Sequence, residues 1–368
     1  MSRQARLVDA LTNAGIDGFL ATSDAGIFYT SGFATHAYER LTGVLVTADG
    51  GLSMIVPALD EESASEQLPG VEMRTWSDGD DPLALVIDEL KRRGLGSGAV
   101  GVEDLSFPVG WADRVRADLP GVTLVHGEAM LSDLRAVKDP DELSKLEAAA
   151  RAVSDAFDEL GSHLAAGVTE SEASATLVRL INAAGAQVSG RPLIATGANG
   201  AKPHTSAGPR KLETGDLMVV DSGAIVDGYW GDITRCFVVG DPSPKQQEVY
   251  DIVRRAHGAA IEALRPGART GDIDKAARTV IDEAGYGKYF VHRTGHGLGV
   301  EVHEAPFLAP GTDVELKAGM VVTIEPGIYL PGEFGVRLED DVAVTAGAPK
   351  VFSTADRELR TVGGGVGG

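Results

Sequence analysis

The feature that most restricts the fold is an Asp227-Gly228 pair inside the strand-like segment LMVVDSGAIVDGYWGDITRCFVV. Asp-Gly is among the strongest signals for a two-residue hairpin turn. If the turn lies there, the numbers of paired residues add up to 227 plus 228, or 455, and Asp221 faces Thr234. Asp232 then lies on the same face of the hairpin as Asp221 and diagonal to it.

The two aspartates of this hairpin have two interpretations. They can be acids on a solvated polar face, or carboxylates on a buried face, where they repel each other unless a cation lies between them. The outer ends of the hairpin, residues 217–220 and 236–239, are apolar. This favours a buried strand pair and makes Asp221 and Asp232 candidate cation ligands.

The run HRTGHGLGVEVHE contains three of the eight histidines, His292, His296 and His303. The glycines between them make a helix unfavourable. The run therefore predicts a glycine-broken loop that leads into a strand, with imidazoles projecting from closely approaching backbone. A loop of this kind is typical of a hydrolytic site.

Three further segments contain candidate polar residues. Glu325 interrupts the apolar run VVTIEPGIYL, where an unpaired buried glutamate would be costly. Arg337 and Glu339 share a face of the predicted strand GVRLEDDVAV, a spacing that is also typical of an exposed salt bridge. His204 follows a proline in the loop TGANGAKPHTSAG, where a histidine taken alone is usually just exposed.

These segments together supply four carboxylates and one imidazole as candidate metal ligands. The candidates are Asp221, Asp232, His296, Glu325 and Glu339. The set suits two divalent ions, best Mn²⁺, with Fe²⁺, Co²⁺ or Zn²⁺ as alternatives. A structural zinc site is disfavoured, because the chain has a single cysteine and no HExxH motif.

Length and composition limit the class of protein. The chain has 368 residues, 43% of them hydrophobic, which predicts two domains with substantial cores. Its formal net charge of −21 argues against nucleic-acid partners and against anionic membrane surfaces. Because Cys236 is the single cysteine and no segment resembles a membrane span, we expect a cytoplasmic protein.

A change of pattern near residue 130 predicts the domain boundary. The earlier residues alternate between strand-like and helix-like segments, which is typical of a mixed α/β domain. Asp139-Pro140 predicts the start of a long helix, and Thr169 with Glu172 forms a capping box for the next one. The predicted parts are an N-terminal domain at 1–128, a linker at 129–138 and a second domain at 139–368.

The ligands and their surroundings resemble the pita-bread dinuclear metallopeptidases (peptidase family M24), which comprise methionine aminopeptidase, aminopeptidase P and prolidase. The run HRTGHGLGVEVHE is similar to the signature of the proline peptidases in that family. NGAKPHTSAG, IEPGIYLPGEFGVRLEDDV and RAVKDPDEL also resemble this branch, and SDAGIFYTSGF is a looser match. The resemblance implies an α/β two-domain protein, with an N-terminal creatinase-like mixed α/β domain and a C-terminal pita-bread α+β catalytic domain.

The resemblance also implies how the metal ions are held. Asp221 would bind one ion, and His296 with Glu325 would bind the other. Asp232 and Glu339 would bridge the two ions. A bridging water would then lose a proton easily and attack the scissile carbonyl group.

The family resemblance assigns further roles to residues around the metal ions. Glu325 would accept the proton and pass it on. His303 would stabilise the tetrahedral intermediate, and His204 would contact the substrate backbone or relay a proton. His292 and Arg337 are positions that the proline-specific branch shares, and Arg337 would hold the site electrostatically.

The implied activity is hydrolysis of the Xaa-Pro peptide bond by a metal-bridged hydroxide, in dipeptides as in a proline dipeptidase (prolidase). The implied substrate is thus a small peptide with proline at its second position. The alternative is an Xaa-Pro aminopeptidase, which releases the N-terminal residue from longer peptides. Because the ligand set is complete, it argues against a metal-free creatinase-like hydrolase and against a non-enzymatic binding module.

The segment SGFATHAYERL in the first domain has two interpretations. It can be a plain surface loop. In proline dipeptidases, however, a first-domain loop reaches over the active site of the partner subunit, which implies a homodimer. His36, Tyr38 and Arg40 would then meet the substrate, with Arg40 pairing in a bidentate manner with its carboxylate.

Overall fold

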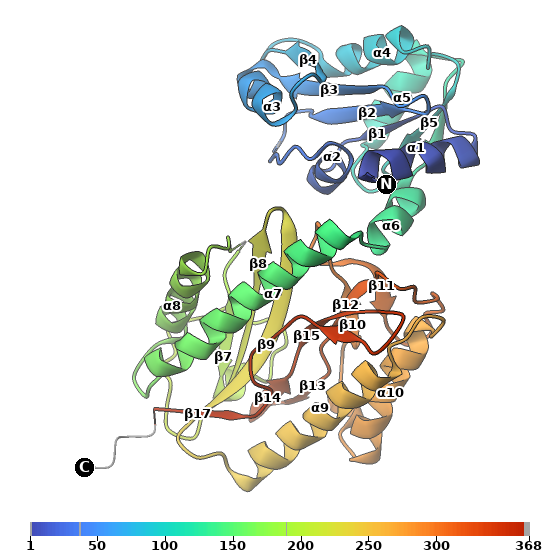
Figure 1. Cartoon of the computed structure of the whole chain (residues 1–368). Helices are drawn as coiled ribbons and strands as arrows, with labels where there is room; N and C mark the ends of the chain where they lie inside the picture. Colours follow the sequence, from blue (N-terminus) through green and yellow to red (C-terminus); the bar gives the residue numbers. More distant parts are fainter. Residues whose placement is uncertain (1, 37, 189, 364–368) are drawn as a thin grey trace. The chain divides into compact units, whose positions relative to one another are not determined.

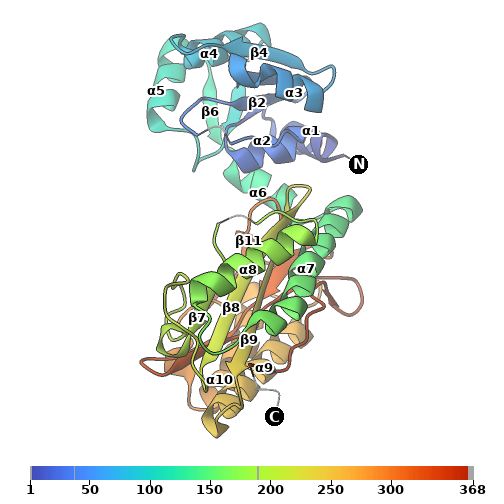
Figure 2. The ribbon, with the colours of Figure 1, turned by 90° about the vertical axis from the view of Figure 1, so that its left-hand side faces the viewer.

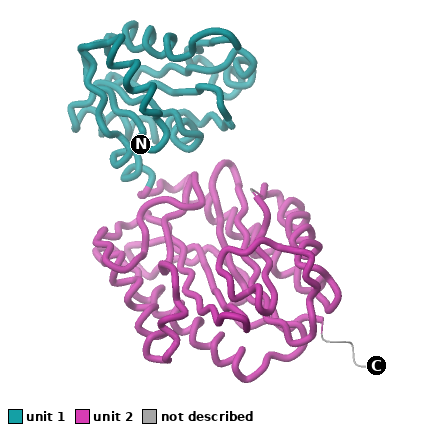
Figure 3. The backbone as a smooth tube through the Cα atoms, turned by 180° about the vertical axis from the view of Figure 1, so that it is seen from behind, with its two compact units in different colours: residues 1–135 teal, residues 136–368 magenta. Residues whose placement is uncertain are grey.

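The structure is a computed structural model, shown as a ribbon in Figure 1. The chain divides into two compact units, residues 1–135 and 136–368 (Figure 3). The strands of each unit pair only within that unit, and each unit has its own hydrophobic core. The residues described are 2–36, 38–188 and 190–363.

The first unit is a six-stranded sheet with the strand order β4-β3-β2-β1-β5-β6. β2 and β3 form the predicted antiparallel hairpin, while β1, β5 and β6 run parallel. Helices α4 and α5 bury Leu90 and Val115 against one face of the sheet, and α1 and α2 lie on the other (Figure 1). The elements are α1 (Arg3–Ala14), β1 (Gly18–Ala21), α2 (Asp24–Ser31), β2 (Gly43–Thr47), β3 (Leu52–Pro57), α3 (Glu61–Gln67), β4 (Glu72–Trp76), α4 (Pro82–Arg92), β5 (Ala99–Val102), α5 (Val109–Asp118) and β6 (Thr123–His126).

Between this sheet and the second unit the chain forms helix α6, Glu128–Ala136. The helix covers most of the segment 129–138 that the sequence analysis assigns to a linker. Leu131 and Ala136 of this helix are buried, so apolar side chains pack here and stabilise a helix in place of an extended connection. The domain limits derived from the sequence stay a prediction.

The two long helices that open the second unit begin where the sequence predicts. Asp139 caps α7 (Pro140–Leu160) and forms a capping box with Glu142. Thr169 caps α8 (Glu170–Ala183) and forms the expected box with Glu172. In both boxes the cap side chain and the side chain three residues later satisfy backbone N–H groups that have no partner within the helix.

The rest of the second unit consists of two sheets, the hairpin β13-β14 and the helices α9 and α10. The sheet β17-β9-β8-β7 is covered by α7 and α8 (Figure 2), and the second sheet has the order β11-β10-β12-β15-β16. Among the helices of the described residues, none combines the length and apolar character needed to cross a membrane. The remaining elements are β7 (Leu193–Thr196), β8 (Leu217–Val226), β9 (Tyr229–Val239), α9 (Pro244–Ala263), α10 (Thr270–Glu283), β10 (Gly295–Gly297), β11 (Glu304–Leu308), β12 (Val321–Ile324), β13 (Gly327–Leu330), β14 (Phe334–Arg337), β15 (Asp340–Ala343), β16 (Lys350–Val351) and β17 (Arg360–Val362).

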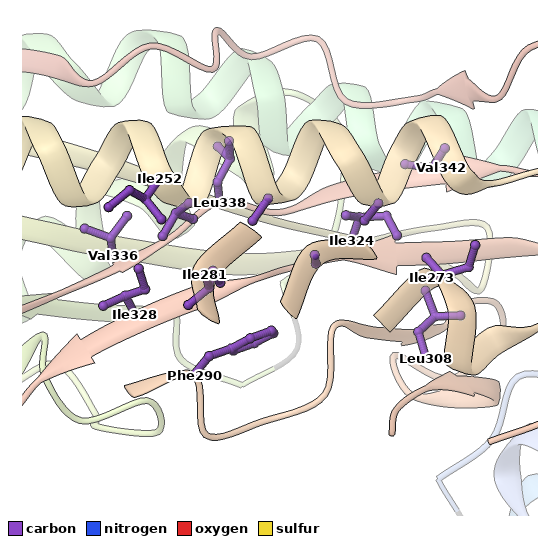
Figure 4. Close-up of a cluster of buried hydrophobic side chains, with 14 of the residues drawn as sticks. Ile252, Ile273, Ile281, Phe290, Leu308, Ile324, Ile328, Val336, Leu338 and Val342 are labelled. Atoms are coloured by element: carbon purple, nitrogen blue, oxygen red, sulfur yellow. The ribbon is translucent and has the colours of Figure 1, made fainter. Parts of the chain in front are cut away.

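The main core of this unit lies between α9, α10 and the strands that carry the candidate site. Ile273 and Ile281 of α10 pack there with Phe290, Leu308 and Ile324, as Figure 4 shows. Burial of such side chains is the dominant favourable contribution to folding. The core therefore holds the loop around Phe290 and the end of β12 in fixed positions.

The second unit contains two halves with matching turns. Before α8, the backbone N–H of Gly167 donates to the carbonyl oxygen of Leu212 at 2.8 Å. Before α10, Gly267 donates in the same way to Leu316, also at 2.8 Å. The first half contains α7, α8 and the strands β7–β9, and the second contains α9, α10 and the strands β10–β15.

Candidate metal centre

The structure brings together all five residues that the sequence predicts as metal ligands. Asp221 lies on β8 and Asp232 on β9, while His296 lies on β10. Glu325 follows β12, and Glu339 lies between β14 and β15. Their ligand atoms form overlapping groups, within each of which the atoms lie within 4.8 Å of one another. The groups are Asp221 with Asp232 and Glu339, His296 with Glu325 and Glu339, and Asp232 with His296 and His303.

The hairpin has the register that the Asp-Gly turn predicts. Asp221 is paired with Thr234, and Asp232 lies diagonally across from Asp221, opposite Gly223. Thr234 joins the hairpin to the second sheet, because its hydroxyl donates to Oε2 of Glu339 at 2.6 Å. The predicted register of the two acids is confirmed, and Asp232 is buried, whereas the side chain of Asp221 is 25% exposed.

The carboxylates of this cluster repel one another. Burial, and then the charge of Asp221, raises the pKa of Asp232 well above its usual range. Burial and the charge of Asp232 do the same for the pKa of Glu339. Burial also raises the pKa of Glu325 to about 7, although Arg337 opposes this. Buried acids of this kind are stabilised by a bound cation, so the oxygen-rich set fits two divalent ions.

His296 has a free nitrogen directed at the cluster. Its Nδ1 lies 3.0 Å from the carbonyl oxygen of Gly297, which can only accept, so Nδ1 carries the proton. Nε2 then lies 3.6 Å from Oε1 of Glu325 with its lone pair available. Burial lowers the pKa of His296 to about 3, which keeps the ring neutral, as metal binding requires.

The glycines beside His296 are explained by close backbone contacts. A side chain at Gly295 would overlap the carbonyl oxygen of Thr323, and one at Gly297 would overlap that of Ala305. Both glycines have neighbouring strands on either side, since β10 pairs with β11 and β12. The predicted close approach of the backbone is therefore present, and it places His296 deep in the second sheet.

A hydrogen-bonded chain connects His292 to Asp221. His292 Nδ1 donates to the carbonyl oxygen of Arg293 at 2.7 Å, so Nε2 accepts from the Tyr329 hydroxyl at 2.9 Å. The same hydroxyl accepts from Nη1 of Arg337 at 2.9 Å, and Nη2 of Arg337 donates to Oδ2 of Asp221. Sequence reasoning missed Tyr329, because GIYL reads as an ordinary apolar strand.

Arg337 is buried at 4% exposure, so the alternative of an exposed Arg337–Glu339 pair is wrong. Its Nε donates to the Thr234 hydroxyl at 3.1 Å, and its Nη1 donates to the carbonyl oxygen of Pro203 at 3.3 Å. The contact with Pro203 places the next residue, His204, beside the site, where it is exposed. The guanidinium thus ties the hairpin to the loop that carries this histidine.

His303 lies against the inner histidine of the cluster. Its ring stands edge-on to the ring of His296, with the ring centres 4.2 Å apart. His303 itself is exposed, and burial of part of the ring lowers its pKa. A largely neutral imidazole at the open side of the cluster can donate a hydrogen bond to an oxygen of a bound molecule.

The three residues of the first-domain loop lie in the first unit, where their contacts are local. Nδ1 of His36 lies 3.2 Å from Oδ2 of Asp24. Arg40 forms a bidentate pair with Asp78, at 3.2 and 3.0 Å. Tyr38 is 91% exposed and has a positive φ of 48°. Their role in substrate binding stays a prediction.

Comparison with known proteins identifies the family. The model of metallopeptidase family M24 matches residues 144–346, and that of the Creatinase/Prolidase N-terminal domain matches residues 3–137. The chain belongs to metallopeptidase family M24, and the predicted combination of a creatinase-like domain with a pita-bread catalytic domain is confirmed.

Individual relatives cover almost the whole chain. A putative dipeptidase, YkvY, from Bacillus subtilis (strain 168) is 36% identical over 361 residues, which are 98% of this chain and 99% of the relative. A recombinant prolidase from Thermococcus sibiricus superposes with a TM-score of 0.91 at 36% identity, over 98% of this chain and 100% of that one. An X-Pro aminopeptidase from Thermotoga maritima MSB8 gives a TM-score of 0.91 at 30% identity, with the same coverage.

Proposed function

We propose that this chain hydrolyses the Xaa-Pro bond of dipeptides with the help of two divalent metal ions, as a proline dipeptidase. The observation that carries the proposal is the cluster of four carboxylates and one neutral imidazole, built into a chain that is similar along 98% of its length to a prolidase and a dipeptidase. The substrate is a small peptide with proline in second position.

The five clustered residues would divide between the two ions. Asp221 would hold one ion, His296 and Glu325 would hold the other, and Asp232 and Glu339, which lie close to ligands of both, would be shared between them. Mn²⁺ suits this oxygen-rich set best, and Fe²⁺, Co²⁺ and Zn²⁺ are alternatives. Bound divalent ions of this kind polarise a carbonyl oxygen and make a water molecule a stronger acid.

The side chains around the ions have separate tasks in the reaction. Glu325 accepts a proton from the attacking water and passes it to the leaving nitrogen. His303 donates a hydrogen bond to the carbonyl oxygen as negative charge develops there, and His204 contacts the substrate backbone. Arg337 keeps Asp221 in place, and its bond to the Tyr329 hydroxyl orients that group towards His292.

We also propose a homodimer in which the first-domain loop of one subunit meets the substrate of the other. His36, Tyr38 and Arg40 are the loop residues concerned. Tyr38 is exposed and available for such a contact. Arg40 is held by Asp78 in the isolated chain, so it would exchange one carboxylate partner for another when it binds the free carboxylate of a dipeptide.

The compartment that we propose is the cytoplasm. Cys236 is the single cysteine of the chain and is buried, where its thiol donates to the carbonyl oxygen of Arg337. A chain without the means to form an internal disulfide suits a reducing compartment.

An Xaa-Pro aminopeptidase is the second candidate, because the chain superposes equally well on the enzyme of that name from Thermotoga maritima. Product analysis with Ala-Pro, Leu-Pro, Ala-Pro-Ala and Ala-Ala, each with added Mn²⁺, separates the two. Cleavage of the two Xaa-Pro dipeptides alone supports the dipeptidase. Efficient cleavage of Ala-Pro-Ala supports the aminopeptidase and contradicts the role of Arg40.

Two further classes are tested by the same measurements. Without hydrolysis of any of the four peptides, a creatinase-like hydrolase or a non-enzymatic binding module would be the better interpretation. Metal analysis of the purified protein then separates the classes. Absence of bound metal would support one of these two, and bound metal would indicate an inactive metallopeptidase. The retained ligand set, Asp221, Asp232, His296, Glu325 and Glu339, supports an enzyme.

A further inference from the structure

Two residues of helix α10, Asp274 and Arg278, contact the loop that leads into the metal centre. Asp274 is only 1% exposed, which is costly for a carboxylate unless it is paired and hydrogen-bonded. Arg278, one helical turn further on, donates to it from Nε at 2.9 Å and from Nη2 at 3.0 Å. These two bonds alone would be an ordinary pair within a helix.

The other hydrogen bonds of Arg278 reach the loop. Nη1 donates to the carbonyl oxygen of Phe290 at 3.0 Å, and Nη2 donates to that of His292 at 2.9 Å. The guanidinium carbon also lies 4.2 Å from the centre of the Phe290 ring, which belongs to the core beside α10 (Figure 4). Arg278 therefore fixes the backbone from which the His292 imidazole projects.

Asp274 fixes the next part of the loop through Thr294. Its Oδ1 accepts from the Thr294 backbone N–H at 3.2 Å and from the Thr294 hydroxyl at 2.9 Å. The carbonyl oxygen of Thr294 in turn accepts from the backbone N–H of Glu325 at 2.7 Å. His296 lies two residues beyond Thr294. Through Thr294, Asp274 is thus connected to both residues, His296 and Glu325, that are proposed to hold the same ion.

We propose that Asp274 and Arg278 are positioning residues that set the His296–Glu325 side of the metal centre, and with it one of the two ion positions. The inference rests on the proposed function, since it assumes two bound ions. The other ion depends on the β8–β9 hairpin, which belongs to a different sheet and is held by its own ladder of hydrogen bonds. Loss of the Asp274–Arg278 pair should therefore lower the binding affinities of the two ions by unequal factors.

The test is calorimetric titration of the metal-free protein with MnCl₂, in the wild type and in Arg278→Lys. Lysine keeps the charge, but the three N–H groups on its single nitrogen cannot reproduce the four hydrogen bonds that the planar guanidinium donates. In the variant we expect the ion of His296 and Glu325 to bind about 10- to 100-fold more weakly, the range typical of residues that orient ligands. The other ion should be affected by a smaller factor, because Arg278 reaches Asp221 only indirectly, through His292, Tyr329 and Arg337. The kcat for Ala-Pro should fall with the weakened ion.

Two more variants complete the experiment. Arg114→Lys is the control, because Arg114 also forms an i,i+4 pair, with Asp118 on α5 of the first unit and in the reverse order along the helix, and it should leave both ions unaffected. Thr294→Val removes the hydroxyl contact with Asp274 and keeps the backbone contact. It should weaken the same ion as Arg278→Lys, by a smaller factor.

The inference is wrong if Arg278→Lys binds both ions with wild-type affinity and keeps its kcat. It is also wrong if both ions weaken equally while Tm of the metal-free protein falls, since that result indicates a general structural role. A wild type that binds no Mn²⁺ would overturn the proposed function, and this inference with it. If the wild type binds two ions and hydrolyses Xaa-Pro dipeptides, but the variants give one of the contradicting results, the positioning role alone is wrong and the proposed function stands.

Discussion

Replacement of Glu325 by glutamine should make the metal-free protein more stable, although it removes a proposed ligand. The side chain of Glu325 is 16% exposed, and burial raises its pKa from an ordinary 4.5 to about 7. The folded protein therefore prefers the protonated carboxyl group. Glutamine has nearly the same shape and carries no charge at any pH, so it avoids the cost of a buried carboxylate.

The magnitude follows from the two pKa values. The pKa of Glu325 is higher in the folded protein than in the unfolded chain. Its protonation therefore stabilises the folded protein fully below about pH 4.5, and this stabilisation is lost as the pH rises through about 7. At about 1.4 kcal/mol for each pH unit, the free energy of unfolding of the wild type falls by about 3 kcal/mol. The metal-free Glu325→Gln protein should then exceed the wild type at pH 8 by up to this amount, or about 6 to 12 °C in Tm.

Calorimetry at pH 5 and pH 8 in EDTA, and then with excess Mn²⁺, measures this effect. We expect a small difference at pH 5, a higher Tm for Glu325→Gln at pH 8 in EDTA, and the reverse order with Mn²⁺. The reversal follows because a ligand at 1,000 times its Kd stabilises the protein that binds it by about 4.1 kcal/mol, which exceeds the metal-free advantage of the variant. The control is Glu333→Gln, whose half-exposed side chain pairs with Lys245. A metal-free Glu325→Gln protein with a Tm at or below that of the wild type at pH 8 would refute the reasoning.

Three further predictions concern the site. Asp232→Asn should abolish Mn²⁺-dependent hydrolysis of Ala-Pro while the circular dichroism spectrum stays unchanged, because it removes a bridging carboxylate; full activity in the folded variant would refute the two-ion assignment. Tyr329→Phe should lower kcat about 10- to 100-fold at unchanged Mn²⁺ content, measured by elemental analysis, because His292 and Arg337 lose a shared partner; an unaltered kcat would contradict a role for this network. Arg40→Ala should raise KM for Ala-Pro much more than it lowers kcat, and an unchanged KM in steady-state assays would exclude its contact with the substrate carboxylate.

Local sequence rules predict those features of this protein that depend on neighbouring residues. The Asp227-Gly228 turn determines the register of the hairpin, and with it the relation of Asp221 to Asp232. The helix start at Asp139 follows from the proline at the next position, and the start at Thr169 follows from a capping box of four residues. The family resemblance supplied what local rules could not, namely that residues more than 100 positions apart meet in one cluster.

The residues that sequence reasoning missed have partners far away in the chain. Tyr329 looks like one more apolar strand residue, and its function depends on His292, 37 positions earlier. Asp274 and Arg278 resemble a common i,i+4 pair on a helix surface, and only the packing of α10 against the loop at Thr294 reveals their other contacts. Such contacts are set by tertiary packing, for which a single sequence contains no periodic signal.

The matching turns of the second unit have a consequence for the order in which metal binds. Asp221 lies nine residues beyond Leu212, and Glu325 lies nine residues beyond Leu316. The two halves thus deliver one carboxylate each from corresponding places, as a duplicated scaffold would. The single imidazole of the proposed set, His296, comes from the second half alone. A nearly symmetric framework therefore offers two unlike coordination sites, which would fill one after the other as the metal concentration rises.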